Sequence, residues 1–193
     1  NFSKKLFIER YNAELANDFG NLASRVTALM DKYYDTIPEP AKLTEEEEKL
    51  QERAEKLPDN VHSYIENMDL NKATDKIMEF VRSINKYLEV RKPWKLVKTD
   101  QEEAGTVLYC ATEGLRIAAR LLHPIMPDKI DQLLENLPND EDKGRFEWAG
   151  LAAGEKLGEF DNLFPRIEEE FEEETEEEQG KEEQEDMVTI EDF

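Results

Sequence analysis

The sequence predicts an all-α protein, an antiparallel helix bundle followed by an acidic, disordered tail. Apolar residues recur at intervals of three and four over several long segments, which is the period of an amphipathic helix. Residues that cap or terminate helices stand at the ends of these segments. No segment of useful length alternates apolar and polar residues as a β-strand does. We therefore expect roughly four or five main helices packed as a bundle.

The first predicted helix is long. Its apolar residues form one stripe from Ile8 to Tyr33, and Ser3 stands before it as a plausible N-cap. Pro38 and Pro40 end the segment.

A second, highly charged helix follows. Thr44 and Glu47 have the spacing of a capping box, in which each residue satisfies a backbone N–H of the other. We expect this helix to end near Leu57, because Pro58-Asp59-Asn60 is typical of a break between helices.

The third strong periodic segment begins near Asp69. It must stop near Lys92, because the residue before Pro93 is disfavoured in the α-helical region.

Two further helices are expected in the second half of the chain. Asp100 and Glu103 form a second possible capping box, and the helix that they open ends before Pro124. Pro127 is well placed as the first residue of a following helix that runs to about Asn136.

After Leu137 the helical pattern weakens. Four glycines spread over the next segment indicate irregular structure. Phe164 and Ile167 are apolar residues in an otherwise polar stretch, so we expect both to pack back against the bundle.

The end of the chain is strongly acidic. The formal net charge is -22, and fifteen acidic residues and one lysine lie from Glu168 onward. Residues 168–186 are nearly all Glu, which predicts a solvated, disordered linker. Residues 187–193 turn apolar and β-branched, as at the start of a strand of another domain. The predicted organisation is a helical domain over residues 1–167, then this linker, then a truncated further domain.

Several kinds of chemistry find no support in the sequence. It has no glycine-rich phosphate loop and no nucleophile–base pair, and His62 and His123 lack Cys or carboxylate partners at metal-ligand spacing. Cys110 is the single cysteine, so no internal disulfide can form, and we expect it in the core. This cysteine usage fits a reducing cytoplasm. No apolar run approaches the roughly 18 residues of a membrane span.

One segment reverses the charge of the chain. Residues 82–98 hold six basic residues and a single acid, Glu89, and Trp94 follows Pro93 within them. A fixed indole among cations offers unpaired nucleic-acid bases a stacking surface, while the cations neutralise phosphates. The alternative is a tryptophan that anchors a loop to the core, with lysines as a solvated rim.

Asn21 and Arg25 form a second candidate feature, on the first helix. Four residues apart, they lie on one side of that helix and flank its apolar stripe. An amide and a guanidinium together can hydrogen-bond a base edge and stack on it. The alternative is an ordinary surface pair.

The same two features belong to motifs that resemble a known family. These motifs are residues 10–25 (RYNAELANDFGNLASR), 85–89 (NKYLE) with 92–96 (KPWKL), 121–127 (LLHPIMP) and 163–167 (LFPRI). Their order and spacing are similar to those of the helical anticodon-binding domain of bacterial methionyl-tRNA synthetases, which are class I aminoacyl-tRNA synthetases. The resemblance extends over about residues 1–167.

The resemblance implies roles for particular residues. It implies that Trp94, beside Pro93, stacks on the cytosine that begins the anticodon CAU, while Asn21 and Arg25 contact anticodon bases. The basic residues around the tryptophan are then candidates for contacts with the RNA backbone: Arg91, Lys92, Lys95 and Lys98.

The resemblance also implies a longer parent protein. That parent would be an ATP-dependent methionine–tRNA ligase of the cytoplasm, with ATP and Mg²⁺ held in a catalytic domain that precedes this segment. The present segment would then bind tRNA(Met) without cofactor, metal, membrane or catalytic residues of its own. Residues 187–193 resemble the start of an appended tRNA-binding barrel, through which the parent would form a homodimer.

Two alternatives stay open at this point. The acidic tail is compatible with a helical protein-interaction module that engages basic proteins. Valyl-, isoleucyl- and leucyl-tRNA synthetases share a related helical domain, although the combination of Asn21, Arg25, Pro93 and Trp94 favours methionine.

Overall fold

The computed structural model describes residues 3–140, 143–158 and 162–168, and over these ranges it confirms the all-α prediction. The described residues contain no strand beyond one isolated bridge between Asn139 and Leu151. The helical elements are α1 (Lys4–Arg10), the π-helix η1 (Tyr11–Gly20), α2 (Asn21–Tyr33), α3 (Glu45–Glu66), α4 (Leu70–Arg91), α5 (Pro93–Leu96), α6 (Gln101–Leu122) and α7 (Pro127–Leu134).

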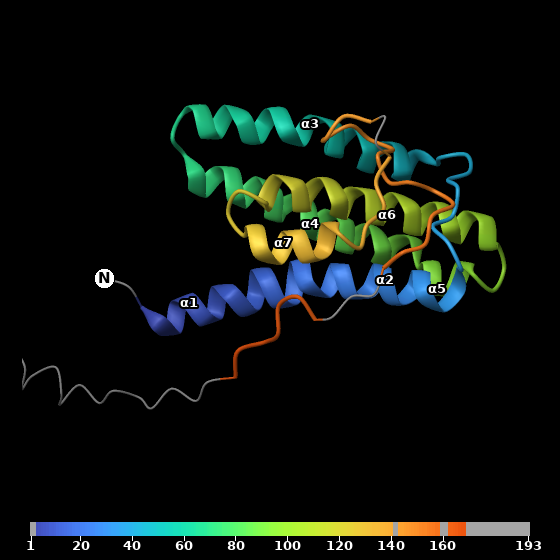
Figure 1. The fold of residues 1–193 in the computed structure, drawn as a ribbon, viewed down its shortest axis with the longest axis horizontal. Helices are drawn as coiled ribbons and strands as arrows, with labels where there is room; N and C mark the ends of the chain where they lie inside the picture. The colour runs from blue at the N-terminus through green and yellow to red at the C-terminus, as the bar shows by residue number, and fades with distance from the viewer. Residues whose placement is uncertain (1–2, 141–142, 159–161, 169–193) are drawn as a thin grey trace, which may run out of the picture.

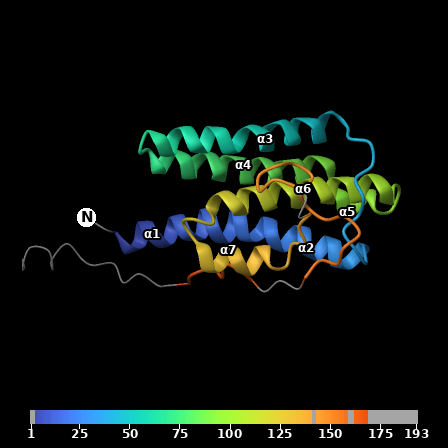
Figure 2. The ribbon, with the colours of Figure 1, turned by 45° about the horizontal axis from the view of Figure 1, so that its top comes forward.

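The helices run side by side along the length of the molecule (Figures 1 and 2). α1, η1 and α2 continue one another as a single rod, and α3 and α4 form a hairpin. α6 is the central helix, since it contacts α2, α3, α4, α5 and α7, and most of its residues are buried. The irregular C-terminal segment crosses the bundle and returns along the rod (Figure 1).

The first helix differs from its prediction in one respect. The N-cap is confirmed, because the backbone N–H of Leu6 donates to Ser3 Oγ at 3.3 Å. Over Tyr11–Gly20, however, the bonding is that of a π-helix, and the N–H of Asn21 reaches back five residues to the carbonyl of Ala16. The apolar spacing of the sequence does not distinguish a π-helix from an α-helix. The widened segment coincides with the place where the returning segment packs on the rod.

The predicted break at Pro58-Asp59-Asn60 is wrong. α3 passes through Pro58 and ends at Glu66. Proline removes one backbone hydrogen bond within a helix, but the buried positions Leu57 and Val61 on either side of it keep one continuous stripe. Packing of that stripe on α4 and α6 holds the helix together across the proline.

The other predicted helix ends are confirmed with one amendment. Asp69 caps α4, and Lys92 ends it in the left-handed region at φ 49°. The Asp100 side chain accepts from the N–H of Glu103 at 2.9 Å, but the reciprocal half of that capping box is missing. The Glu103 carboxylate instead accepts from Arg91, and the Asp100 N–H bonds to the carbonyl of Leu96.

The returning segment packs on the rod as predicted. Phe164 is buried, and its ring meets that of Phe19 edge-on at 5.9 Å. The backbone of Ile167 exchanges two hydrogen bonds with the Asn12 amide, at 3.0 and 2.9 Å. The predicted linker beyond Glu168 and the predicted strand at residues 187–193 lie outside the described residues.

Candidate nucleic-acid interface

The junction between α4 and α5 holds Trp94 in a fixed position. Lys92 takes the left-handed conformation that ends many helices, and Pro93 then begins the one-turn helix α5. Pro93 is buried and Trp94 is half-buried. Pro93 therefore lies inside the bundle, and the half-buried Trp94 is the residue of this pair that exposes surface to a ligand.

The structure brings Trp94 and Arg25 together from opposite parts of the sequence. The Cζ atom of Arg25 lies 5.5 Å from the centroid of the Trp94 ring. Arg25 Nη2 also donates to Glu89 Oε1 at 2.6 Å. Arg25 is thus held between an aromatic ring and a carboxylate. A solvent-exposed cation–π contact such as that of Arg25 with Trp94 contributes about 0.5–1 kcal/mol.

Asn21 lies on the same side of the rod, one turn before Arg25. It is exposed, and it is the first residue of α2 after the π-helix. The site therefore places the amide of Asn21, the guanidinium of Arg25 and the indole of Trp94 one after another along one surface. That set can stack on a nucleobase and hydrogen-bond its edge, and it contains no group positioned for proton transfer.

Sequence reasoning missed the role of Glu89. The only signal was its position as the single acid within a basic stretch. Its contact with Arg25 joins residues on α4 and α2, and no local pattern predicts a pairing across helices.

Arg91 occupies a different environment from the one predicted. Its Nε donates to Glu47 Oε1 at 2.9 Å and its Nη2 donates to Glu103 Oε1 at 2.7 Å. Tyr87 also donates to Glu47, at 2.6 Å, and we call these four residues the Glu47 cluster. Because carboxylates from α3 and α6 already hold Arg91, its role at an RNA phosphate stays a prediction based on sequence.

The Glu47 carboxylate is fully buried yet ionised. Burial acts to raise its pKa, but hydrogen bonds from Thr44 and Tyr87 and the charge of Arg91 outweigh burial and hold the pKa below its ordinary value. The cluster therefore ties the start of α3, the end of α4 and the start of α6 together through charge.

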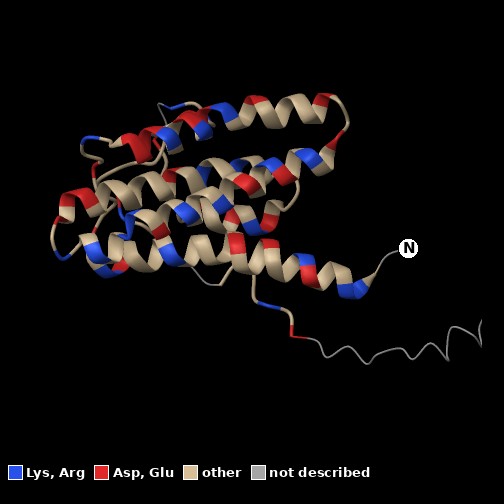
Figure 3. Ribbon diagram, turned by 180° about the vertical axis from the view of Figure 1, so that it is seen from behind, with Lys and Arg blue, Asp and Glu red and all other residues tan. Residues whose placement is uncertain are grey.

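Lys92, Lys95 and Lys98 are exposed around Trp94. Among the described residues, no carboxylate lies within ion-pair distance of these three lysines. Figure 3, which shows the molecule from behind, shows Lys and Arg interspersed with Asp and Glu along the helices, so the net charge of the chain does not describe each local segment. A locally basic surface therefore persists on an acidic chain.

The remaining titratable candidates belong to the scaffold. Burial, with the nearby charges of Glu47 and Glu113, raises the pKa of Cys110 to about 12, so this core thiol stays protonated. In the part of the chain that the structure describes, no group of three His, Cys, Asp or Glu residues is arranged to hold a metal ion. No described helix is long and apolar enough to cross a membrane.

Comparison with known proteins identifies the fold. A family model described as the anticodon binding domain of methionyl tRNA ligase matches residues 37–184. The chain belongs to this family. A methionine–tRNA ligase of Caldanaerobacter subterraneus is 37% identical over the whole chain, and one of Clostridium acetobutylicum is 34% identical over 86% of it.

Solved structures agree with this assignment. The methionyl-tRNA synthetase of Mycobacterium tuberculosis in its free state superposes with a TM-score of 0.81 at 29% identity, covering 88% of this chain and 36% of that one. The present chain spans about a third of the length of the relatives that it matches. The Caldanaerobacter match also includes the rod with Asn21 and Arg25, which lies before the residues matched by the family model.

Proposed function

We propose that this anticodon-binding domain binds the CAU anticodon of tRNA(Met), with Trp94 stacking on the first base and Asn21 and Arg25 contacting base edges. One observation carries the proposal. Arg25 and Trp94, predicted separately from two distant motifs, lie in contact with each other, and Asn21 lies one turn away on the same surface. Lys92, Lys95 and Lys98 supply the positive charge that an RNA strand requires there.

The parent protein is proposed to be a cytoplasmic methionine–tRNA ligase that uses ATP. Supporting this, relatives carrying that name match the chain, and a methionyl-tRNA synthetase of Mycobacterium tuberculosis was solved in complex with methionyl-adenylate. The catalytic step and its ATP and Mg²⁺ would belong to other parts of the parent, and the present residues would select the tRNA. Dimerisation of the parent stays a prediction.

The direct test is a titration of the chain at low salt with a short RNA stem-loop that bears CAU. We expect a preference for CAU over loops bearing valine, isoleucine or leucine anticodons. Trp94→Ala should weaken CAU binding by about 5- to 150-fold, because loss of base stacking on an aromatic ring costs about 1–3 kcal/mol.

The second tryptophan provides a matched control. Trp148 lies on the irregular segment after α7, so Trp148→Phe should keep the preference for CAU. Equal, weak and salt-sensitive binding of all loops by the unaltered chain would overturn the proposal that this domain selects the anticodon, although its family membership would stand.

A further inference from the structure

An open groove lies between α3 and the irregular segment that follows α7, and we call it the Trp148 groove. It has a volume of about 760 Å³, and two aromatic residues of the irregular segment line it, Phe146 and Trp148, both half-buried. Its carboxylates are Glu55 and Asp59 of α3 and Glu147 of the irregular segment. Among the described residues, one basic residue lines it, so the groove combines aromatic surface with an excess of negative charge.

Contacts with the core fix the aromatic side of the groove. Arg116 of α6 is almost wholly buried, and its guanidinium donates to the backbone carbonyls of Arg145 at 3.2 Å and Glu147 at 2.6 Å. The backbone N–H of Gly150 donates to Glu113 Oε1 at 3.0 Å. The backbone on both sides of the two aromatic residues is therefore attached to α6, and the rings need little ordering when a ligand binds.

The α3 side of the groove presents two neighbouring carboxylates. Glu55 and Asp59 are four residues apart, and they share one face because α3 continues through Pro58. Glu55 accepts a hydrogen bond from the uncharged amide of Gln51 at 2.7 Å. No Lys, Arg or His of the described residues lies within ion-pair distance of Glu55 or Asp59, whereas other glutamates of α3 have such partners. Like charges at this spacing repel each other, so a cation placed between them would be stabilised.

A cation already lies over one of the two rings. The Cζ atom of Arg145 is 5.9 Å from the centroid of the Phe146 ring. No cation of the described residues lies over the Trp148 ring, although tryptophan attracts cations more strongly than phenylalanine does. An arginine guanidinium stacks on aromatic faces and donates to carboxylates in a planar fork. The indole of Trp148 and the carboxylates of α3 thus match the two ways in which a guanidinium binds.

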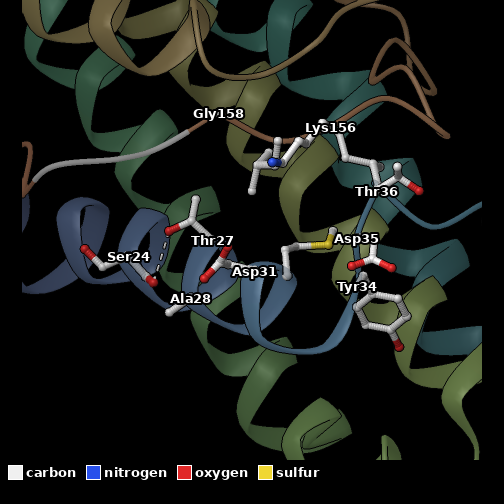
Figure 4. A pocket seen from close by; sticks show the side chains of 12 residues that line it. Ser24, Thr27, Ala28, Asp31, Tyr34, Asp35, Thr36, Lys156 and Gly158 are labelled. Carbon is white, nitrogen blue, oxygen red and sulfur yellow. Dashed lines mark hydrogen bonds between the residues drawn. The ribbon is translucent and has the colours of Figure 1, made fainter.

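The groove at the end of α2 is a weaker candidate for such a ligand (Figure 4). It has a volume of about 530 Å³, and Asp31 and Asp35 line it, but Lys156 of the returning segment lines it too. Its one aromatic residue among those described is Tyr34, whose hydroxyl donates to the carbonyl of Gln101 at 2.7 Å. This groove therefore offers less excess negative charge and no indole.

We propose that the Trp148 groove docks an arginine side chain that a basic segment of another protein presents. The guanidinium stacks on the Trp148 indole and donates to the carboxylates of Glu55 and Asp59. Carboxylates attract a cationic peptide and repel phosphate, so the groove selects a protein and not RNA. The site is independent of the anticodon role, since Arg25 and Trp94 lie on other elements, α2 and α5.

The test follows the indole N–H signals of the full chain by NMR, because the sequence has only two tryptophans. Trp148→Phe removes one of the two signals and thereby assigns it. The probe is a short peptide with blocked ends, Gly-Gly-Arg-Gly-Gly, and its control carries citrulline, which keeps the shape of arginine without the charge. We expect the arginine peptide to shift the Trp148 signal and to bind about 3- to 30-fold more tightly than the citrulline peptide.

Two double variants test the carboxylates. Glu55→Gln combined with Asp59→Asn should lower the ratio of the two affinities by about 1.5- to 5-fold, because the exposed ion pairs are lost. Glu48→Gln combined with Glu66→Gln removes two exposed carboxylates from α3 outside the groove, so the ratio should stay as it is in the unaltered chain. Unfolding midpoints equal to that of the unaltered chain will show that both double variants fold, as expected for exposed positions.

Three results would overturn the proposal. The first is a Trp148 signal that does not move, or that reports equal affinity for the two peptides. The second is an equal loss in both double variants, because the net charge of the chain would then attract the peptide. The third is a shift of the Trp94 signal alone, which would place the arginine peptide at the proposed RNA surface.

Discussion

Arg116 is a charged residue in the middle of the core. Its side chain is almost wholly buried and donates to both carboxylate oxygens of Glu113, at 2.9 and 2.7 Å. It also donates to the backbone carbonyls of Arg145 and Glu147. A Cβ atom at Gly150 would come within 2.5 Å of this guanidinium, so the close approach requires glycine there. One ion pair thus attaches the irregular segment to α6.

Removing the arginine alone should therefore be costly. Arg116→Met leaves the Glu113 carboxylate buried without its partner, and we expect the free energy of unfolding to fall by about 3–5 kcal/mol. Urea unfolding followed by circular dichroism measures this. Arg53→Met on the exposed surface should change stability by no more than about 0.5 kcal/mol. A drop of similar size in both variants would show that the buried pair has no special role.

Single residues also mark the limits of prediction from sequence. Trp94 was predicted as a candidate from the basic stretch around it, and Asn21 and Arg25 from their spacing on one helix, while their roles came from the resemblance to the family. The pairing of Arg25 with Glu89 was not predicted, since Glu89 lies on another helix. The pairing of Arg91 with carboxylates of α3 and α6 was not predicted either. Contacts between distant segments depend on how helices pack, and helix periodicity carries no information about them.

At the scale of helices, local signals located most ends and failed where packing decided. The caps at Ser3 and Thr44 follow the expected hydrogen-bond pattern, and α4 starts directly after Asp69, where the periodic segment was predicted to begin. Pro58 did not end α3, because the stripe on both sides of it is buried against neighbouring helices. Helix boundaries are thus predictable where a capping side chain accepts a hydrogen bond from the first turn of the helix. They are less predictable where tertiary packing overrides a local preference.

The Glu47 cluster should make the bundle sensitive to acid. A carboxyl whose pKa is lowered by folding stabilises the folded state above its unfolded pKa, about 4.3 for glutamate. That stability is lost as the pH falls from there through the lower folded value, because the buried carboxylate must then be protonated. Glu47→Gln should lower stability at neutral pH and flatten the fall in stability below about pH 4.3.

Unfolding in urea at a series of pH values measures this effect. Glu48→Gln is the matched control, because Glu48 lies in the same first turn of α3 and is exposed. Its curve should parallel that of the parent chain. If the free energy of unfolding of Glu47→Gln falls as steeply below about pH 4.3 as that of the parent chain, other carboxylates set the acid sensitivity.

Across the whole molecule, charge is divided between a mixed bundle and an acidic end. Fourteen acidic residues and one lysine lie from residue 169 onward. A chain that stops at Glu168 should unfold at the same temperature, since it keeps every core residue that the structure describes. It should bind the CAU stem-loop more tightly at low salt, because glutamates repel phosphate, and the gain should vanish at high salt.

The same truncation tests the protein-interaction alternative. The measurement is RNA affinity at two salt concentrations, with binding to a basic protein such as histone as a parallel readout. Loss of histone binding at physiological salt, together with unchanged RNA binding, would favour an interaction role for the acidic end. A lowered unfolding temperature would show that this end also stabilises the bundle.

The number of residues in the π-helix η1 sets how far the residues after it are rotated about the rod axis relative to the residues before it. At the start of η1, Asn12 attaches the rod to the returning segment, and after η1 come Asn21 and Arg25 of the proposed anticodon site. A π-helix holds more residues per turn than the 3.6 of an α-helix, so an α-helical segment would need fewer residues for the same register. Loss of one residue between Tyr11 and Gly20 that relaxes part of η1 to an α-helix would therefore keep the direction in which Asn21 and Arg25 point. Loss of one residue from α2 before Asn21 and Arg25, in a segment that stays α-helical, would instead turn both by about 100° about the rod axis. The widened segment thus tolerates a change in length that an α-helical segment of the rod does not.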